Sequence, residues 1–229
     1  MVGEVLVMSR FRLVSQAVAA ALTGRGVRVE DVAWSAGVHR ATSALTETDM
    51  VLLLDDLEDR HAVLAAQELV AQSRARFLVL TSCPEGPSWG ALLAGGAEAL
   101  MPVDSSLDVV IAAVSVLGDG ESPISETTRD RLVREWATWL AEDNDLRARM
   151  DRLSARERTV LHLLAGGYRV HEIASELRTA EATVRSQTKS MRRKLGVDSQ
   201  LAAVALVRRM GGSVGGSPPV LPRPRQAQG

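Results

Sequence analysis

The chain has 229 residues, of which 46% are hydrophobic, and its formal net charge is −1 at pH 7. This length predicts two modest domains, and the apolar content is enough for two cores. The single cysteine, Cys83, excludes a disulfide within the chain. No apolar run approaches membrane-spanning length, and MVGEVLVMSR at the start is too short and interrupted for a signal peptide. We therefore expect a cytoplasmic protein with no membrane partner.

Charge is distributed unevenly along the chain. Residues 1–120 contain 8 arginines, no lysine and 15 acidic residues, a net charge of −7. Residues 151–210 contain 12 basic and 6 acidic residues, a net charge of +6. The near-neutral total thus hides an acidic front and a basic back. This asymmetry favours phosphate contact by the rear part of the chain, and also its attraction to the front part.

Residues 1–120 alternate between two hydrophobic patterns. Apolar runs at residues 4–8, 50–54, 77–80 and 97–101 are typical of buried strands, and helical patterns lie at 13–22, 60–71, 89–94 and 107–117. The alternation predicts an α/β domain with a doubly wound parallel sheet, for which we expect five strands, four of them located by these runs. Ligands of such sheets bind at the carboxyl ends of the strands. The candidate site residues are therefore those that follow the strands: Ser9, Arg10, Asp55, Asp56, Thr81, Ser82, Pro102 and Val103.

Residues 121–152 are predicted to form a helical linker. Its apolar residues follow a heptad-like spacing, and we expect the helix to break near Asn144. The stripe consists of Leu132, Trp136, Trp139, Leu146, Met150 and Leu153. Two tryptophans on one exposed stripe would be costly, so we expect them to be covered. The sequence leaves open whether the first domain or the same helix of a second subunit covers them.

Residues 153–210 are predicted to form an all-α domain of four short helices. Ser154 and Glu157 have the spacing of a capping box at the start of the first helix, and the glycines at 166–167 end it. A second helix follows through residues 173–177. Asp198 or Ser199 caps the fourth helix, whose apolar face is Leu201, Val204, Ala205 and Leu206. The remaining residues, 211–229, are rich in Gly, Pro and Ser and are predicted to be disordered.

The third of these helices has two different faces. Apolar residues at 184, 191 and 195 fall at helical spacing, and Arg185, Lys189 and Arg192 lie on the other side with Ser186 beside them. Two helices joined by a tight turn, the second with a basic face, are typical of a helix-turn-helix that enters the major groove of DNA. The alternative is a solvated cationic face without a ligand, and the charge segregation favours DNA.

The segments LSARE, HEIASEL, ATVRSQ and RRKLGV resemble the DNA-binding domain of LuxR/FixJ-type, NarL-like transcription regulators over about a quarter of the chain. The resemblance implies double-stranded DNA as a partner, base reading by Arg185, Ser186 and Lys189, and phosphate contacts from Thr183 and Lys194. It further implies a homodimer through the fourth helix, and leaves room for RNA polymerase as a partner.

Three positions depart from the pattern of that family. Ala180 stands where a serine usually caps the third helix, with Thr179 as the nearest substitute. Gln187 replaces a common histidine, and Ala202 replaces a glutamate. These departures concern the preferred operator rather than DNA binding itself.

The segments VLVMSRFRLV, TDMVLLLDD, FLVLTS and GGAEALMPVD resemble the receiver domain of response regulators over roughly half of the chain. A working receiver holds Mg²⁺ with a carboxylate pair after the first strand, where Ser9 and Arg10 stand here. Asp55 is the best candidate for the phosphoryl acceptor, yet it lies one residue later than the spacing of the family. Thr81 fits the hydroxyl position, and Val103 replaces the lysine that pairs with the phosphoryl group.

No lysine precedes Lys189, so a shifted alignment cannot supply the missing one. Phosphoryl transfer needs metal and cation charge, and we therefore predict a degenerate, atypical receiver whose regulation is independent of phosphorylation. The alternatives are a conventional phospho-activated response regulator that uses Asp55, and a protein-interaction module.

The resemblance also implies a small molecule or a partner protein as the signal. The expected ligand site is one cleft bounded by Arg10, Asp55, Thr81 and Val103, in which Arg10 offers a fixed cation to an anionic group. A second interpretation is a stable link between Arg10 and Asp55 that holds the domain in one state.

No catalytic chemistry is indicated by the remaining polar residues. The four histidines lie in four separate segments without ligand spacing, and the glycine pairs lack the pattern of a phosphate-binding loop. We predict no metal site, no cofactor and no enzymatic activity.

Overall fold

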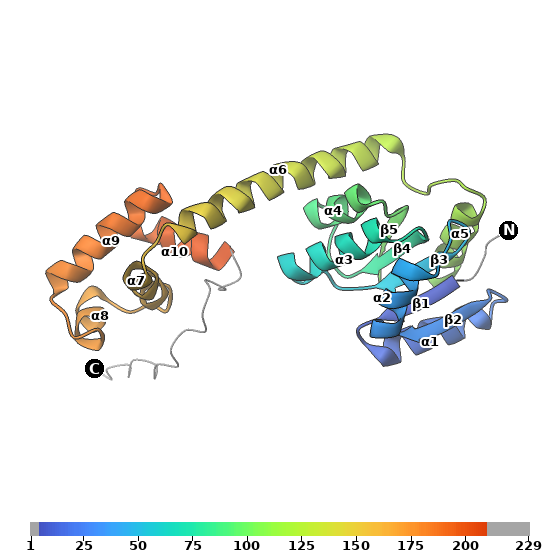
Figure 1. The fold of residues 1–229 in the computed structure, drawn as a ribbon, viewed down its shortest axis with the longest axis horizontal. Coiled ribbons are helices and arrows are strands. Elements are labelled where there is room, and N and C mark those ends of the chain that lie inside the picture. Colours follow the sequence, from blue (N-terminus) through green and yellow to red (C-terminus); the bar gives the residue numbers. More distant parts are fainter. Residues whose placement is uncertain (1–4, 210–229) are drawn as a thin grey trace. The chain divides into compact units, whose positions relative to one another are not determined.

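The structure is a computed structural model that describes residues 5–209, in which strands and helices alternate through the first half and helices alone follow (Figure 1). The strands are β1 (Val5–Ser9), β2 (Val29–Ala33), β3 (Met50–Leu54), β4 (Arg76–Thr81) and β5 (Ala99–Pro102). The helices between and after them are α1 (Arg12–Thr23), α2 (Trp34–Ser43), α3 (Arg60–Gln72), α4 (Pro87–Gly95) and α5 (Leu107–Gly118). The remaining helices are α6 (Glu126–Asp151), α7 (Ala155–Ala165), α8 (Val170–Glu176), α9 (Glu181–Leu195) and α10 (Gln200–Arg209).

The five strands form one parallel sheet in the order β2-β1-β3-β4-β5. Alternate residues of the strands point to opposite faces, so each face has its own core. Val5 and Val7 pack with α1 and α5, whereas Leu6 and Met8 pack in the cluster that contains α3 and α4. Both faces are covered, and the predicted doubly wound fold followed by an all-α domain is confirmed.

Strand β2 and helix α2 lie in a stretch for which no element was predicted. Strand β2 is at the edge of the sheet, and within it only Val32 is buried. An edge strand with Glu30 and Asp31 on it lacks the continuous apolar run that marks the central strands. Helix α2 has no side-chain cap from which its start could be predicted.

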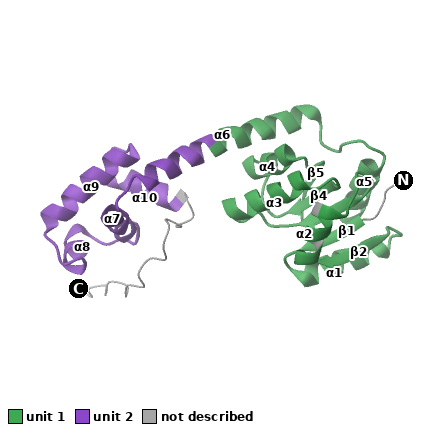
Figure 2. Ribbon diagram, in the orientation of Figure 1, with its two compact units in different colours: residues 1–140 green, residues 141–229 purple. Residues whose placement is uncertain are grey.

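The chain divides into two compact units, residues 1–140 and 141–229 (Figure 2). The boundary falls within α6, so the predicted linker, residues 121–152, belongs partly to each unit. Helix α6 is one uninterrupted helix. The expected break near Asn144 was wrong. Asparagine costs a helix only a few tenths of a kcal/mol. The flanking i, i+4 ion pairs, Arg147 with Asp143 at 2.7 Å and Arg149 with Asp145 at 2.6 Å, favour the helical state.

The first half of α6 is part of the core of the first unit. Trp136 is only 4% exposed in the cluster beneath α4, and its ring stacks on that of Trp139 with centroids 5.1 Å apart. A glycine makes this packing possible, since a Cβ at Gly90 of α4 would lie 2.0 Å from the carbonyl oxygen of Leu132. The first unit thus buries Trp136 and partly covers Trp139, which favours packing against the first domain, one of the two alternatives that the sequence left open.

The second unit has its own core, formed by the end of α6 and helices α7 to α10. Leu146 and Met150 bring α6 into this core, where they join Leu161 and Ile173. The predicted tail, residues 211–229, lies outside the described residues. Within residues 5–209, no helix is both long enough and apolar enough to cross a bilayer.

Candidate nucleic-acid interface and sheet-edge site

The all-α part of the chain begins, at α7, with the predicted capping box. The backbone N–H of Ser154 donates to the Glu157 carboxylate at 2.7 Å, and the N–H of Glu157 donates to the Ser154 hydroxyl at 3.3 Å. These bonds satisfy two amides at the start of α7 that would otherwise lack helical acceptors. Helix α7 then packs against α9, and α8 packs against the same helix.

Helix α9 has the two faces that the sequence predicts. Val184, Met191 and Leu195 are fully buried, and Thr188 also points inward, with its hydroxyl donating to the carbonyl oxygen of Val184 at 2.8 Å. The predicted base-reading residues Arg185, Ser186 and Lys189, and the predicted phosphate contact Thr183, are all exposed. Burial of the apolar face therefore leaves the polar face outward.

A hollow of about 520 Å³ runs along the cationic side of α9. Four cationic side chains line it, namely Arg185, Lys189, Arg192 and Arg193. No acidic residue lines this hollow in the described part of the chain. Glu181 pairs with Arg185 at 2.9 Å, one turn away. Arg193 was missed by the sequence reasoning, because its position beside Arg192 places it off the i, i+4, i+7 row. The hollow suits an anion such as a phosphate group.

Lys194 is placed differently from these cations. Its Nζ lies 2.6 Å from the Glu157 carboxylate of α7, and its side chain is 32% exposed. The pair ties the end of α9 to the start of α7. Burial acts to raise the pKa of Glu157, but hydrogen bonds from Lys194, Ser154 and Ser190 outweigh it and lower the pKa to about 2. The predicted phosphate contact of Lys194 stays a prediction.

The start of α9 has no side-chain cap. Ala180 is the N-cap residue, and its methyl group cannot accept a hydrogen bond. Thr179 was expected as the substitute, and this was wrong. Its N–H donates to the carbonyl oxygen of Ala174, so Thr179 completes the end of α8 instead.

An ion pair lies at the carboxyl ends of the strands in the first unit. Asp55 follows β3, and its carboxylate is nearly buried. One carboxylate oxygen accepts from Arg10 Nε at 3.0 Å, and the other accepts from the backbone N–H of Leu57 at 2.9 Å. The guanidinium of Arg10 also lies 4.6 Å from the ring centroid of Trp34. The structure thus contains the pair between Arg10 and Asp55, and that this pair holds the domain in one state stays a prediction.

Ser9 and Thr81 make local hydrogen bonds, whereas the Ser82 hydroxyl donates to the Asp56 carboxylate at 2.8 Å, between the ends of β4 and β3. Ser9 is buried and accepts from the N–H of Phe11 at 3.1 Å, and Thr81 is buried and accepts from the N–H of Cys83 at 3.1 Å. Val103 is 44% exposed. All five predicted pocket residues therefore lie at or just beyond the carboxyl ends of β1, β3, β4 and β5.

These residues do not form one cleft, contrary to expectation. Arg10 and Asp55 line a hollow of about 190 Å³, whereas Thr81 and Val103 line a separate cleft of about 920 Å³. Arg10 and Asp55 bond to each other, and the Thr81 hydroxyl accepts from the backbone N–H of Cys83. These polar groups therefore do not face one common volume. Within residues 5–209, no group of three or more His, Cys, Asp or Glu side chains is placed to hold a metal ion.

Comparison with known proteins gives the relationship of each part. Residues 151–207 match the family model of bacterial regulatory proteins, luxR family. The nitrate/nitrite response regulator homolog of Haemophilus influenzae is 28% identical over 174 residues, which cover 75% of this chain and 80% of that protein. The nitrate/nitrite response regulator NarP of Escherichia coli is 33% identical over 132 residues, which cover 58% of this chain and 59% of NarP. Among solved structures, RcsB of Salmonella typhimurium has a TM-score of 0.44 at 20% identity, covering 91% of this chain and 98% of that one.

The buried Glu157 makes the stability of the second unit depend on pH. Because its pKa is about 2 when folded and 4.5 ordinarily, its stabilisation is complete above about pH 4.5 and is lost as the pH falls towards 2. At 1.36 kcal/mol per unit, we expect a loss of about 3 kcal/mol in this window. Hydrogen exchange of the α9 amides measures it. Glu157→Gln should remove this dependence and the exposed control Glu176→Gln should keep it; identical profiles would contradict the assignment.

Proposed function

We propose that this chain is a sequence-specific DNA-binding transcription regulator. The match of residues 151–207 to the luxR family model and the similarity to nitrate/nitrite response regulators support the proposal. The observation that carries the proposal is the outward face of α9, where four cations line one hollow on a helix whose opposite face is buried. A helix of 15 residues with such a face fits the major groove.

The cations that line this hollow, and Ser186, have separate roles in the proposal. Arg185 and Lys189 donate to acceptors on base edges, most favourably those of guanine, and Ser186 donates or accepts beside them. Arg192 and Arg193 lie further along the same hollow, where phosphate oxygens flank the groove. The net charge of +6 over residues 151–210 adds attraction that does not depend on sequence.

We further propose that the regulator works without phosphorylation of Asp55. Both oxygens of this carboxylate already have donors, one being the guanidinium of Arg10. Ser9 and Arg10 stand where the metal-binding acids are needed, and the first unit contains no lysine. Transfer of a phosphoryl group to Asp55 would have to break the ion pair and proceed without the usual metal charge.

The proposed DNA-bound form is a homodimer joined through α10. Leu201 is 78% exposed and Ala205 is exposed on the same side, whereas Ala203 and Val207 are buried. The predicted apolar face of this helix is thus only partly core, and its outer part is left for a partner. Trp136 is buried within its own unit, so the stripe on α6 no longer supports dimerisation. Two subunits would match paired half-sites on DNA.

Replacement of the base-reading residues tests the groove assignment. Arg185→Ala and Lys189→Ala should each cost about 1–3 kcal/mol in operator affinity and relax specificity at one base pair. Fluorescence anisotropy with a duplex from the chain's own upstream region measures this at two salt concentrations. Arg156→Ala, on the first turn of α7, is the matched control. Unchanged affinity in both α9 variants would show that this helix does not read the groove.

Treatment with acetyl phosphate and Mg²⁺ tests the independence from phosphorylation. We expect no added phosphoryl group by intact mass and no change in DNA affinity, because the metal-binding acids and the lysine are missing. Asp55→Asn is the control for specific modification. A phosphoryl group that this variant abolishes, with a matching change in affinity, would establish the conventional phospho-activated regulator instead.

A pair of exposed leucines tests the dimer. Leu201→Asp should shift the sedimentation of the DNA-bound protein from two subunits per site to one, since an aspartate in an apolar interface is left desolvated. Leu13→Asp is the control, because Leu13 is 79% exposed in the first unit. If only the control variant dissociated, the interface would lie on the first unit; a single subunit in the unaltered protein would contradict the dimer.

A further inference from the structure

A hollow in the first unit lies where β4 and β5 end. Its volume is about 920 Å³, which is within the range of small-molecule sites. One wall comes from the loop after β4, including Cys83 and Glu85. The opposite wall is the chain that enters α6, from Pro123 to Thr128. The cleft is distinct from the hollow beside Arg10 and Asp55.

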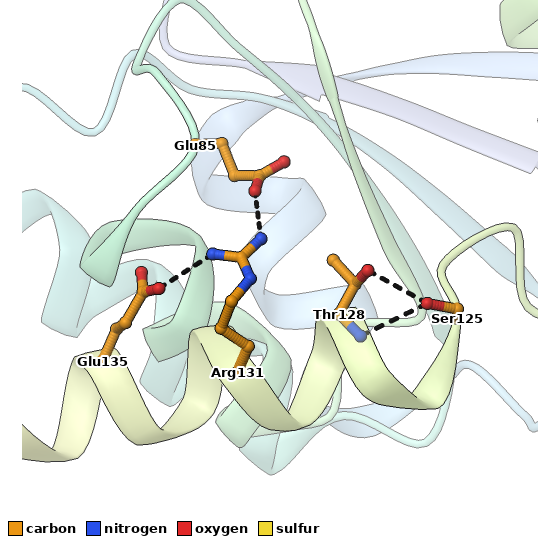
Figure 3. Close-up of polar contacts among 5 residues, drawn as sticks. All are labelled: Glu85, Ser125, Thr128, Arg131 and Glu135. Carbon is orange, nitrogen blue, oxygen red and sulfur yellow. Dashed lines mark hydrogen bonds and ion pairs between the residues drawn. The ribbon is translucent and has the colours of Figure 1, made fainter.

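Several bonds hold the second wall in place. The guanidinium of Arg129 donates to the carbonyl oxygens of Ala97 at 3.0 Å and Glu98 at 2.8 Å, which fastens the first turn of α6 to the start of β5. At the helix start, the Ser125 hydroxyl accepts from the backbone N–H of Thr128 at 3.2 Å and donates to its hydroxyl oxygen (Figure 3). The cleft is therefore formed before any ligand binds.

Arg131 joins the two walls. It bonds to Glu85 on the loop after β4 and to Glu135 on its own helix, as Figure 3 shows. Hydrogen bonds with Glu135 and Glu85 raise the pKa of Arg131 above its ordinary value, so it stays charged. The charge of Glu85 is balanced by this partner.

The lining of the cleft defines the ligand. Trp89 and Leu100 are buried beneath the cleft, and Val103 and Ile124 provide apolar surface at its wall. Glu85 and the exposed Asp104 are the charged lining residues, and no lysine, arginine or histidine lines the cleft in the described part of the chain. With Glu85 balanced by Arg131, the charge left to a ligand is that of Asp104.

We propose that this cleft binds a small organic cation, whose apolar body lies against Val103 and Ile124 and whose protonated amine faces Asp104. An anion is disfavoured there, in contrast to the hollow beside Arg10. A bound molecule contacts the first turn of α6 directly, because Ser125 and Thr128 line the same cleft. The proposal concerns the first unit alone and does not depend on DNA binding.

Two dyes with one fluorophore and opposite charges test the charge preference. Dansylcadaverine carries a protonated amine and dansylglycine a carboxylate, and both brighten in an apolar site. In titrations of the full chain without DNA, dansylcadaverine should bind at least tenfold more tightly than dansylglycine. Asp104→Asn should weaken dansylcadaverine at least fivefold, whereas Glu47→Gln, an exposed acid elsewhere on the first unit, should not. Equal binding of the two dyes, or an unchanged affinity in Asp104→Asn, would overturn the proposal.

The single cysteine provides a second readout, which is measured on the unaltered protein. Cys83 lines the cleft and is partly exposed, so N-ethylmaleimide can reach its thiol. Saturating dansylcadaverine should slow this alkylation severalfold, and dansylglycine at the same concentration should not. An alkylation rate that dansylcadaverine leaves unchanged would place the dye elsewhere and refute the site.

Discussion

At Gly90 the backbone of α4 lies so close to α6 that a single added carbon would meet the carbonyl oxygen of Leu132. This approach lets Trp136 sink into the core and brings the start of α6 against the ends of β4 and β5. Three features depend on this close approach: the cleft, the bonds of Arg131 to both of its walls, and the burial of Trp136 within the first unit. A glycine is the only residue that leaves room for such contact between two helices.

Buried carboxylates in both units are neutralised by cations of the chain itself. Asp55 is paired with Arg10 at the sheet edge, and Glu157 is paired with Lys194 between α7 and α9. A buried charge without a partner would cost several kcal/mol, so these pairs are structural requirements. The cations Arg185 and Lys189 take no part in either core and are exposed at the surface.

The parts that the sequence could predict are those with strong periodicity. The central strands and the buried face of α9 have uninterrupted apolar patterns, and the capping box of Ser154 depends on a local spacing of three residues. Strand β2 could not be predicted, because an edge strand with one buried residue has no such pattern. The ion pair of Lys194 and the separation of Thr81 from Asp55 into two hollows depend on contacts between distant segments. The continuity of α6 through Asn144 depends on neighbouring ion pairs that outweigh a weak propensity.

The pair between Arg10 and Asp55 also bears on how a signal could persist over time. A phosphoryl group on an aspartate is a covalent record, which one reaction writes and another erases, so its lifetime is set by kinetics. An ion pair between two side chains forms when the domain folds and stores no history. In a regulator built on such a pair, the output at any moment follows the concentrations of the protein and of whatever binds to it. Such a protein responds at equilibrium and keeps no memory of an earlier stimulus.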